Sequence, residues 1–270
     1  MIKILCPNCG EPLTREPSRW FCVNGHSFDV ARQGYVNLLP VGWKHSKNPG
    51  DSRLQVAARK EFLDGGHYLP VAETLAALLA AESPKTLLDV GCGEGYYLTF
   101  VQQVLPGLEG IGVDISKDAV RYAAVRNKNA VFLTATASHL PFPACEFDAL
   151  TSLFALTLPE EFARVVRPGG IFVQVTAGPD HLMGLKSIIY PEIHRKEPHE
   201  AEDLPGFTLQ NERLLEFPFT LEGNEDVLRL LSMTPHVMRI TAEGMARARA
   251  AERLSDRAQV CFRVYRRAGI

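Results

Sequence analysis

The feature that most constrains the fold is a glycine-rich segment, Asp89-Val90-Gly91-Cys92-Gly93-Glu94-Gly95, at the point where a short apolar strand meets a helix. Its glycines permit a tight turn and allow a ligand to approach the backbone closely. Around it, strand-like and helical stretches alternate, which predicts βαβ units and a mostly parallel sheet. The sequence thus indicates an α/β fold with a ligand-binding turn after the strand over residues 86–90.

Hydrophobic periodicity predicts the individual elements. Helices are expected over residues 52–63, 69–81, 96–105, 159–166 and 224–232, with one more beginning at Ser116, which suits an N-cap. Pro168-Gly169-Gly170 is expected to form a turn, and residues 178–206, rich in Pro, His and Glu, resemble an insertion. Seven strands are expected, at residues 86–90, 108–113, 131–134, 147–154, 171–176, 207–221 and 259–267.

A second motif lies near the N-terminus. Cys6-x2-Cys9, twelve residues, and Cys22-x3-His26 form a Cys3His set in which each half places two ligands on one turn. Zn²⁺ accepts four tetrahedral sulfur or nitrogen ligands, and a site with four protein ligands is structural. Zinc is favoured over an iron–sulfur cluster because one ligand is His and three thiols are present. Gly10 and Gly25 suit the turns that such knuckles require.

Composition and charge fit a two-part globular chain. Hydrophobic residues make up 46% of the 270 residues. No run of 18 apolar residues and no secretory leader stands out in the sequence. We therefore expect a cytoplasmic protein without membrane association. Residues 1–60 carry a net charge of +5 and residues 61–270 a net charge of −7. We expect a β-rich zinc module for RNA recognition over 1–40, a linker and helix over 41–66, and a catalytic domain over 67–270.

The glycine-rich turn predicts a nucleoside site. Asp114 ends the next strand, where a carboxylate accepts hydrogen bonds from both ribose hydroxyls. A nicotinamide dinucleotide would require G-x-G-x-x-G, whereas position 96 is Tyr and the third glycine falls one residue early.

The same residues resemble class I S-adenosylmethionine-dependent methyltransferases. In that class the end of the first strand and its loop wrap the methionine and ribose parts of the cofactor, which assigns this role to Asp89, Gly91, Gly93 and Gly95, and Asp114 holds the ribose. The stretch over residues 161–170 resembles the turn before the fifth strand of the class. The resemblance implies a Rossmann-like fold with S-adenosylmethionine as cofactor.

Several further stretches narrow the resemblance to the bacterial 23S ribosomal RNA guanine-N1 methyltransferases, which modify a hairpin loop of domain II. They are Gly34–Pro40, Asn48–Ser52, Gly66-His67-Tyr68 and Pro179–Met183. The resemblance implies that Cys6, Cys9, Cys22 and His26 bind zinc and that Tyr68, Gly93, Glu94 and His181 contact the cofactor. It also implies resistance to macrolide antibiotics for some members. Phe154-Ala155-Leu156-Thr157 departs from the family's Ala-Pro pair on the methyl-acceptor side, which leaves the target nucleotide open.

Guanine N1 carries a proton that must leave around methyl transfer, so a proton acceptor is expected. The candidates are His181 and Asp180, with Glu192 and His194 in the same insertion, and the sequence does not choose among them.

We expect the RNA footprint on the zinc module and its linker, where basic side chains meet phosphates and aromatic rings stack on loop bases. The phosphate candidates are Lys44, Lys47, Arg53, Arg59 and Lys60, and the stacking candidates are Trp43 and His45. A second basic group, Arg263, Arg266 and Arg267, is interpreted as a charged sheet edge.

Three hypotheses remain open at this stage. The first is a 23S ribosomal RNA methyltransferase, and a homodimer that grips the hairpin with two modules is compatible with it. The second keeps the cofactor but changes the acceptor to another RNA, a small molecule or a protein. The third is a zinc-dependent RNA-binding assembly factor without activity. The basic module disfavours the second, and the intact Asp89, glycine loop and Asp114 disfavour the third.

Overall fold

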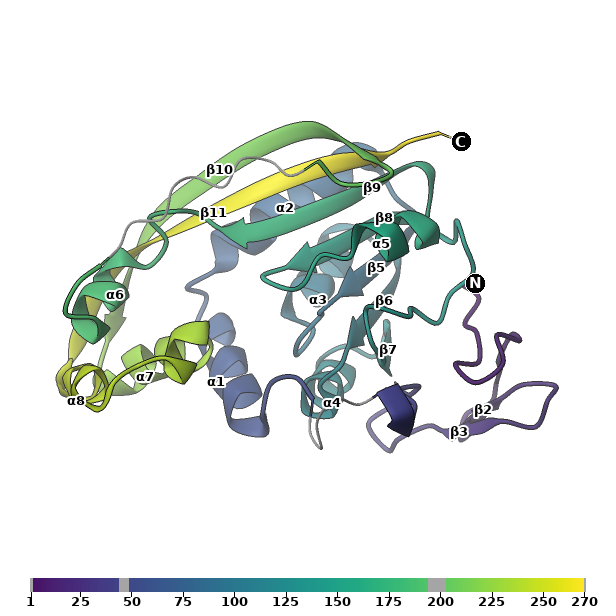
Figure 1. Ribbon diagram of the computed structural model, residues 1–270, viewed down its shortest axis with the longest axis horizontal. Coiled ribbons are helices and arrows are strands. Elements are labelled where there is room, and N and C mark those ends of the chain that lie inside the picture. Colours follow the sequence, from purple (N-terminus) through teal and green to yellow (C-terminus); the bar gives the residue numbers. More distant parts are fainter. Residues whose placement is uncertain (1, 44–48, 194–202, 270) are drawn as a thin grey trace.

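The protein is built on one large twisted sheet, seen in a computed structural model that describes residues 2–43, 49–193 and 203–269. The strand order is β10-β11-β9-β8-β5-β6-β7-β4 (Figure 1). Strands from β4 to β9 pair in parallel, whereas β11 is antiparallel to both β9 and β10. The strands are β4 (Val36–Asn37), β5 (Thr86–Val90), β6 (Glu109–Asp114), β7 (Val131–Thr134), β8 (Phe147–Leu153), β9 (Val166–Ala177), β10 (Phe207–Glu222) and β11 (Arg253–Arg267).

The predicted α/β fold is confirmed, with all seven expected strands and one addition. The short strand β4 comes from the end of the expected zinc module and extends the sheet beyond β7. A separate three-stranded sheet, β1 (Thr14–Arg15), β2 (Arg19–Phe21) and β3 (Ser27–Asp29), forms the module itself.

Helices flank the sheet, and the predicted N-cap at Ser116 is confirmed. Ser52 accepts a hydrogen bond from the amide of Gln55 in a capping box, and Ser116 accepts one from the amide of Ala119. The helices are α1 (Arg53–Asp64), α2 (Leu69–Glu82), α3 (Tyr96–Val104), α4 (Lys117–Arg126), α5 (Pro159–Val165), α6 (Met183–Ile189), α7 (Asn224–Ser232) and α8 (Ala242–Ala250). Two 3₁₀ turns, η1 (Val41–Trp43) and η2 (Pro235–Met238), complete the list.

The two faces of the sheet are covered in different ways. Helices α2, α3 and α4 bury one face, and α5 covers part of the other. The rest of that second face is covered by the N-terminal segment, whose Ile2 and Ile4 are 2% and 1% exposed. Burial of each isoleucine contributes roughly 1.5–3 kcal/mol. The zinc module is therefore attached to the sheet by a shared core (Figure 1).

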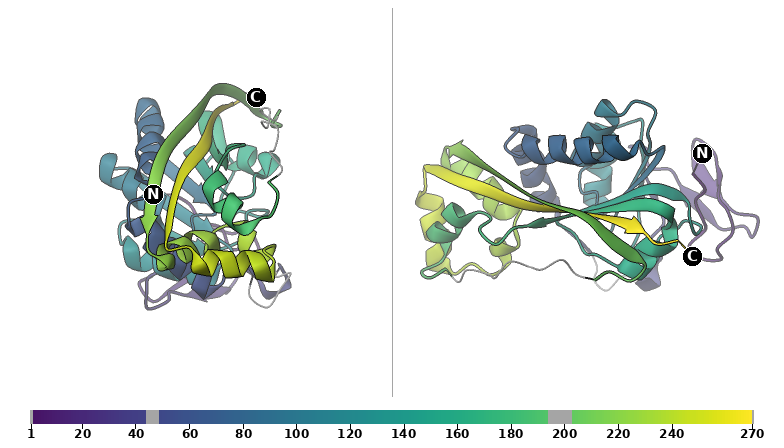
Figure 2. Two further views of the ribbon diagram at one scale, coloured as in Figure 1. Left: turned by 90° about the vertical axis from the view of Figure 1, so that its left-hand side faces the viewer. Right: turned by 90° about the horizontal axis from the view of Figure 1, so that it is seen from above.

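Helices α6, α7 and α8 gather at one end of the long β10–β11 pair, and the module lies at the other end of the molecule (Figure 2). The described part of the chain (residues 2–43, 49–193 and 203–269) has no helix with the length and apolar character needed to span a bilayer.

Three sequence expectations differ from the structure. Pro168-Gly169-Gly170 does not interrupt the chain between two elements but lies within β9, where Gly169 takes a φ of 76° and the pairing with β8 shifts register. The insertion contains the unexpected helix α6, and α8 was not expected. Strand β11 is not an edge, because β10 pairs along its outer side, so the interpretation of its arginines as an edge device is wrong.

Candidate active site and metal centre

The predicted metal ligands converge on one point at the tip of the N-terminal module. The ligand atoms of Cys6, Cys9, Cys22 and His26 all lie within 4.8 Å of one another. Cys6 and Cys9 lie on one tight turn, and Cys22 and His26 lie on another. The amide of Gly10 donates to the carbonyl of Cys6, and the amide of Gly25 donates to the carbonyl of Cys22. Both glycines take left-handed φ values, 78° and 82°, as the sequence predicted for the turns of a zinc site.

The spacing of these atoms fits tetrahedral zinc. With Zn–S near 2.3 Å and Zn–N near 2.0 Å, a tetrahedron has edges of roughly 3.8 Å between sulfurs and roughly 3.5 Å between sulfur and nitrogen. The Cys9 and Cys22 Sγ atoms are 3.7 Å apart, and Cys22 Sγ is 3.4 Å from His26 Nδ1. All four positions of the metal are taken by the protein, so the site is structural.

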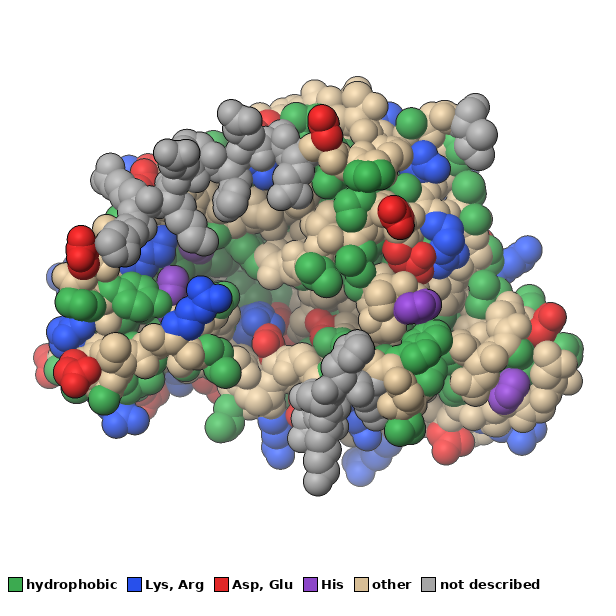
Figure 3. Space-filling model, viewed as in Figure 1, with side chains coloured by type: hydrophobic (Ala, Val, Ile, Leu, Met, Phe, Trp, Pro, Cys, Tyr) green, Lys and Arg blue, Asp and Glu red, His purple; other side chains and the backbone are tan. Residues whose placement is uncertain are grey.

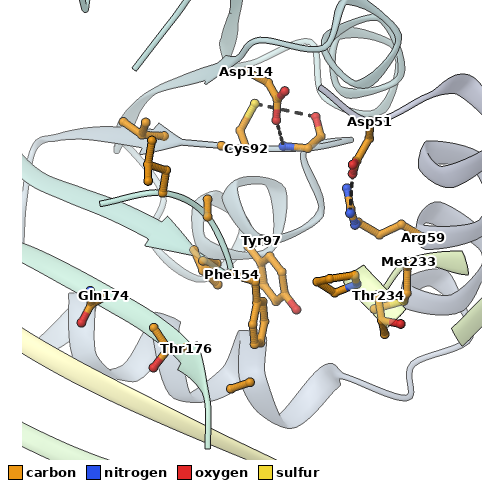
Figure 4. A pocket seen from close by; sticks show the side chains of 18 of the residues that line it. Asp51, Arg59, Cys92, Tyr97, Asp114, Phe154, Gln174, Thr176, Met233 and Thr234 are labelled. Carbon is orange, nitrogen blue, oxygen red and sulfur yellow. Dashed lines mark hydrogen bonds and ion pairs between the residues drawn. The ribbon is translucent and has the colours of Figure 1, made fainter. Parts of the chain in front are cut away.

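The second site is a cleft of about 1370 Å³ along the carboxyl ends of the parallel strands (Figure 4). The glycine-rich turn after β5 forms one end, and residues from β9, β10, β11, α6 and η2 form the other. Figure 3 shows the hollow opening between the two halves of the molecule. A cleft at this edge of a parallel sheet is the usual ligand position in doubly wound folds.

Asp114 organises the glycine-rich turn. Its Oδ2 accepts a hydrogen bond from the amide of Gly93 at 2.9 Å, and its Oδ1 accepts one from the amide of Ser116 at 2.8 Å (Figure 4). Burial raises the pKa of this carboxyl group, while the two amide bonds oppose that rise. Each oxygen still has acceptor capacity, so a pair of ribose hydroxyls fits the group that the sequence singled out.

Asp89 lies beneath the turn and is 2% exposed. Its Oδ1 accepts a hydrogen bond from the Thr151 hydroxyl at 2.8 Å. Burial, against the effect of that bond, raises the pKa of Asp89 to about 7. A carboxyl group so placed lines the cleft as a polar floor below the loop.

Gly91 shows why the loop requires glycine. Its φ is 76°, and a Cβ at this position would lie 2.6 Å from the Cβ of Ala155, closer than two carbons approach. Gly93 also has a positive φ, of 55°, and a Cβ there would lie 3.7 Å from Arg59 Nη1, an ordinary van der Waals contact. The backbone at Gly91 therefore packs directly against the 154–157 loop, and the turn lines the cleft.

Glu94 places a buried carboxyl group in the turn. It is 2% exposed, and its Oε1 lies 3.7 Å from Arg126 Nη2. Neither atom makes a hydrogen bond within the part of the chain that the structure describes. Burial raises the pKa of Glu94, because the arginine only partly compensates for lost water. Such incompletely satisfied polar atoms, together with the glycine cradle and Asp114, fit a polar cofactor in the cleft.

Tyr68 and His181 meet across the cleft from α2 and the insertion. The Tyr68 hydroxyl lies 3.2 Å from His181 Nε2, and the amide of Gln259 donates to His181 Nδ1 at 3.2 Å. Because Nδ1 accepts, the neutral ring carries its proton on Nε2 and donates to Tyr68. Burial lowers the pKa of His181 to about 4. Seven of the eight expected cofactor residues line the cleft: Tyr68, Asp89, Gly91, Gly93, Glu94, Asp114 and His181. The eighth, Gly95, is not in the lining, and a Cβ there would lie 3.0 Å from that of Ala123.

The candidate proton acceptors are less well placed. The amide of Asp180 donates to the Gln259 side chain, and Asp180 is not among the residues that line the cleft. Glu192 is exposed and also outside the lining. His194 lies outside the described residues. His181 is the one candidate in the lining, and both of its ring nitrogens already have partners.

The expected RNA footprint is only partly described. Lys44, His45 and Lys47 lie outside the described residues, and Trp43 stacks against His139 with ring centroids 4.7 Å apart. Arg59 pairs with Asp51 at 2.5 Å, and Lys60 pairs with Asp64 at 2.7 Å, so both charges already have carboxylate partners.

Sequence reasoning missed several residues that build the cleft. Thr151 and Gln174 carry ordinary side chains in expected strands, and no local signal sets them apart. Gly50 was part of a matching stretch but had no assigned role: its φ is 80°, and a Cβ there would lie 2.9 Å from Ile115.

The fold, the glycine cradle and the metal centre define a class I S-adenosylmethionine-dependent methyltransferase with an N-terminal zinc ribbon. A zinc-ribbon family model described as "RlmA, N-terminal" matches residues 4–47, and one described as "Methyltransferase domain" matches residues 87–170. The chain is 37% identical over 240 residues to the 23S rRNA (guanine(748)-N(1))-methyltransferase of Streptomyces fradiae, covering 85% of this chain and 84% of that protein.

It is also 36% identical over 201 residues to the "Putative 23S rRNA (guanine-N(1)-)-methyltransferase" of Micromonospora griseorubida, covering 67% of each chain. This chain belongs to the family of 23S rRNA (guanine-N1-)-methyltransferases. Its cofactors are S-adenosylmethionine and a structural zinc ion.

Proposed function

We propose that the protein transfers a methyl group from S-adenosylmethionine to N1 of a guanine in 23S ribosomal RNA, in a hairpin loop of domain II. The observation that carries the proposal is that a nucleoside cradle at Asp114 and a zinc ribbon belong to one structure with a shared hydrophobic core. The Streptomyces fradiae relative is named for guanine 748, and its similarity extends over 85% of this chain.

The cofactor is held by the residues of the glycine end of the cleft. Asp114 takes the ribose hydroxyls, and the turn from Gly91 to Gly95 lies along the methionine part. The amides of the three glycines hold the shape of the turn, because they donate to Val113, Asp114 and Cys92. Tyr68 and His181 close the cleft opposite the loop, and their mutual hydrogen bond fixes both rings. Asp89 and Glu94 lie at the same end of the cleft, and burial raises the pKa of both carboxyl groups. A bound sulfonium would favour their ionised forms, because opposite charges attract.

The bound cofactor supplies a methyl group that its sulfonium already activates, so the protein chiefly positions the acceptor and excludes water. The base must leave its stack to reach the cleft, because N1 is part of the pairing edge. His181 is a weak proton acceptor at neutral pH, since its pKa is about 4. We therefore assign His181 to orientation of Tyr68, and Asp180 remains the other candidate for the proton.

The division of the chain follows the same proposal. Residues 1–40 bind RNA, residues 41–66 connect, and residues 67–270 carry out methyl transfer, with residues 178–206 as an insertion beside the site. The short β4 pairs with β7, which supports a fixed position of the module beside the cleft. A homodimer would present two such modules to one hairpin, and sedimentation of the protein with and without RNA tests this state.

Mapping of methylated bases in ribosomal RNA tests the activity. Cells without this protein are expected to lack a 1-methylguanine in 23S RNA, and a plasmid copy restores it. Loss of a methyl group elsewhere would favour another acceptor, and an unchanged map would contradict the proposal. The same strains test whether the protein changes susceptibility to macrolides.

A further inference from the structure

The cleft is larger than one cofactor requires. Sites for small molecules and cofactors typically have volumes of about 300–1,000 Å³, whereas this one has about 1370 Å³. The glycine loop, Asp114 and Tyr68 account for one end. The other end, here called the outer half, is lined by the 154–157 loop, β9, β10, β11, α6 and η2, and no residue proposed above to hold the cofactor lies there, except His181 at the boundary.

Two apolar side chains are exposed where the halves meet. Phe154 is 44% exposed and Leu156 is 69% exposed, although both line the cleft. Phe154 has a φ of 52°, a left-handed backbone that a bulky residue rarely adopts. Its amide donates to the carbonyl of Val175 at 2.8 Å, which holds this conformation. Strain that exposes an aromatic ring in a cleft indicates a functional position.

Among the residues that the structure describes, the aromatic neighbours of the Phe154 ring are Tyr68 and His181, both at the cofactor end. Its centroid lies 6.4 Å from that of Tyr68 and 6.2 Å from that of His181 (Figure 4 shows Phe154 beside Tyr97). The loop behind it is anchored, because the Gln174 side chain donates to the Thr157 hydroxyl at 3.0 Å. Phe154 and Leu156 therefore present a fixed apolar surface to the outer half.

Along β9 and β11, the side chains on one face of the sheet change from apolar to polar where the strands line the outer half. On one face, Phe172 and Tyr265 stack in the core with centroids 5.8 Å apart. Two residues further along the strands, the same face carries Gln174 and Arg263, which pair across β9 and β11. Arg263 is 5% exposed, lines the cleft and donates to Glu212 at 2.5 Å.

Further cations reach the outer half from other elements. Lys186 of α6 and Arg239 at the end of η2 line the cleft with Arg263. Figure 3 shows Lys, Arg and His side chains beside the hollow on its α6 side. These charges converge although residues 61–270 carry a net charge of −7. A concave cationic group in an acidic body attracts a polyanion to this point.

We propose that the outer half of the cleft is the pocket of the target nucleotide: its base rests on Phe154 and Leu156, and its phosphates contact Lys186 and Arg239. The Arg263–Glu212 ion pair lines the same pocket. The inference rests on the proposed function and adds which residues receive the acceptor. It places an RNA contact opposite the glycine loop, apart from the zinc module. The order along the cleft is then cofactor, base and phosphate.

Salt dependence of RNA binding tests the phosphate contacts. The double variant Lys186→Gln, Arg239→Gln is titrated with a 23S hairpin transcript from 50 to 200 mM salt, and Arg249→Gln, an exposed cation of α8 outside the lining, is the matched control. The slope of log affinity against log salt should fall by about 1.5, since each phosphate contact contributes about 0.7–0.9. Cofactor affinity should stay unchanged. A slope equal to that of the wild type and of the control overturns the phosphate assignment.

Base contact is tested at Phe154. Phe154→Leu is expected to raise the KM for the transcript about tenfold and to leave cofactor affinity within twofold, whereas Phe154→Tyr keeps the wild-type KM. A 2-aminopurine placed at the mapped target should be quenched on binding to wild type and to Phe154→Tyr, but not to Phe154→Leu. Equal quenching in all three overturns the platform. If wild type methylates no RNA, the proposed function itself fails, which is a separate result.

Discussion

The zinc module and the glycine end of the cleft form their binding sites by different means. The module has strands of two or three residues, and its fold depends on four ligand atoms that close around one point. The glycine turn has no cross-link, and its shape depends on buried strands on either side and on the absence of side chains at Gly91 and Gly93. The first site therefore depends on a bound metal ion, and the second depends on glycine residues that leave the backbone without side chains.

This difference predicts which perturbations each site tolerates. The module should respond to chelators and to loss of a ligand, while the cleft should respond to volume and to charge. The shared core through Ile2 and Ile4 and the pairing of β4 with β7 connect the module to the sheet, so damage to the module can reach the sheet through them. Variants that affect one site and spare the other test whether the comparison holds.

The largest effect is expected from loss of a zinc ligand. Cys9→Ser should release the metal and abolish RNA methylation, because metal binding supplies much of the folding free energy of so small a module. Cofactor affinity should stay within about threefold, since the glycine turn does not depend on the module. Metal content and calorimetry measure both, with the exposed Cys145→Ser as control. Full RNA activity without zinc would contradict the role of the module.

Gly91→Ala should nearly abolish cofactor binding. The added Cβ would meet Ala155 at 2.6 Å and would sit at a φ of 76°, so overpacking and strain together cost about 3–5 kcal/mol. Affinity should fall roughly 100-fold or more. Gly107→Ala is the matched control, because its φ is also positive, 93°, but nothing lies within 4 Å. Equal losses in both variants would show that backbone strain alone, and not the close approach, accounts for the effect.

Asp114→Asn should weaken cofactor binding about 10- to 100-fold. The change keeps the shape but replaces charge-assisted hydrogen bonds, which are worth about 1.5–3 kcal/mol each when an ionised group takes part. Calorimetric titration with S-adenosylhomocysteine measures the loss, and zinc content should not change. Unaltered affinity would refute the ribose role of Asp114.

The smallest effect concerns pH. The unfolded chain protonates His181 near pH 6.5, whereas the folded chain resists protonation until about pH 4. The stability that depends on neutral His181 is therefore complete above pH 6.5 and is lost as pH falls toward 4, by at most about 3 kcal/mol. His181→Asn should flatten the fall in unfolding free energy between these values, measured by urea titration. The exposed His139→Asn should keep the wild-type slope.

Local signals explain what the sequence predicted. Ser52 and Ser116 cap helices through neighbours three residues away, and Gly10 and Gly25 close knuckles within four residues. The zinc ligands and the turn after β5 depend on the same short-range chemistry. Such features are readable because the atoms that determine them are close in the chain.

Long-range pairing explains what the sequence did not predict. Arg263 meets Glu212 across 51 residues of chain, in a strand that lies inside the sheet and not at its edge. Ile2 and Ile4 complete the core of a domain that begins more than 60 residues later. No periodicity encodes these partners, because register and strand order arise only from the packed sheet.

The most direct test of the account is methyl transfer in a purified system. Zinc-loaded protein, labelled S-adenosylmethionine and unmethylated 23S ribosomal RNA are incubated together, and the RNA is then digested to nucleosides. The account predicts label in 1-methylguanosine at one position of the RNA, and none with the Gly91→Ala variant. Label in a different nucleoside, or cofactor binding without any transfer to RNA, would contradict it.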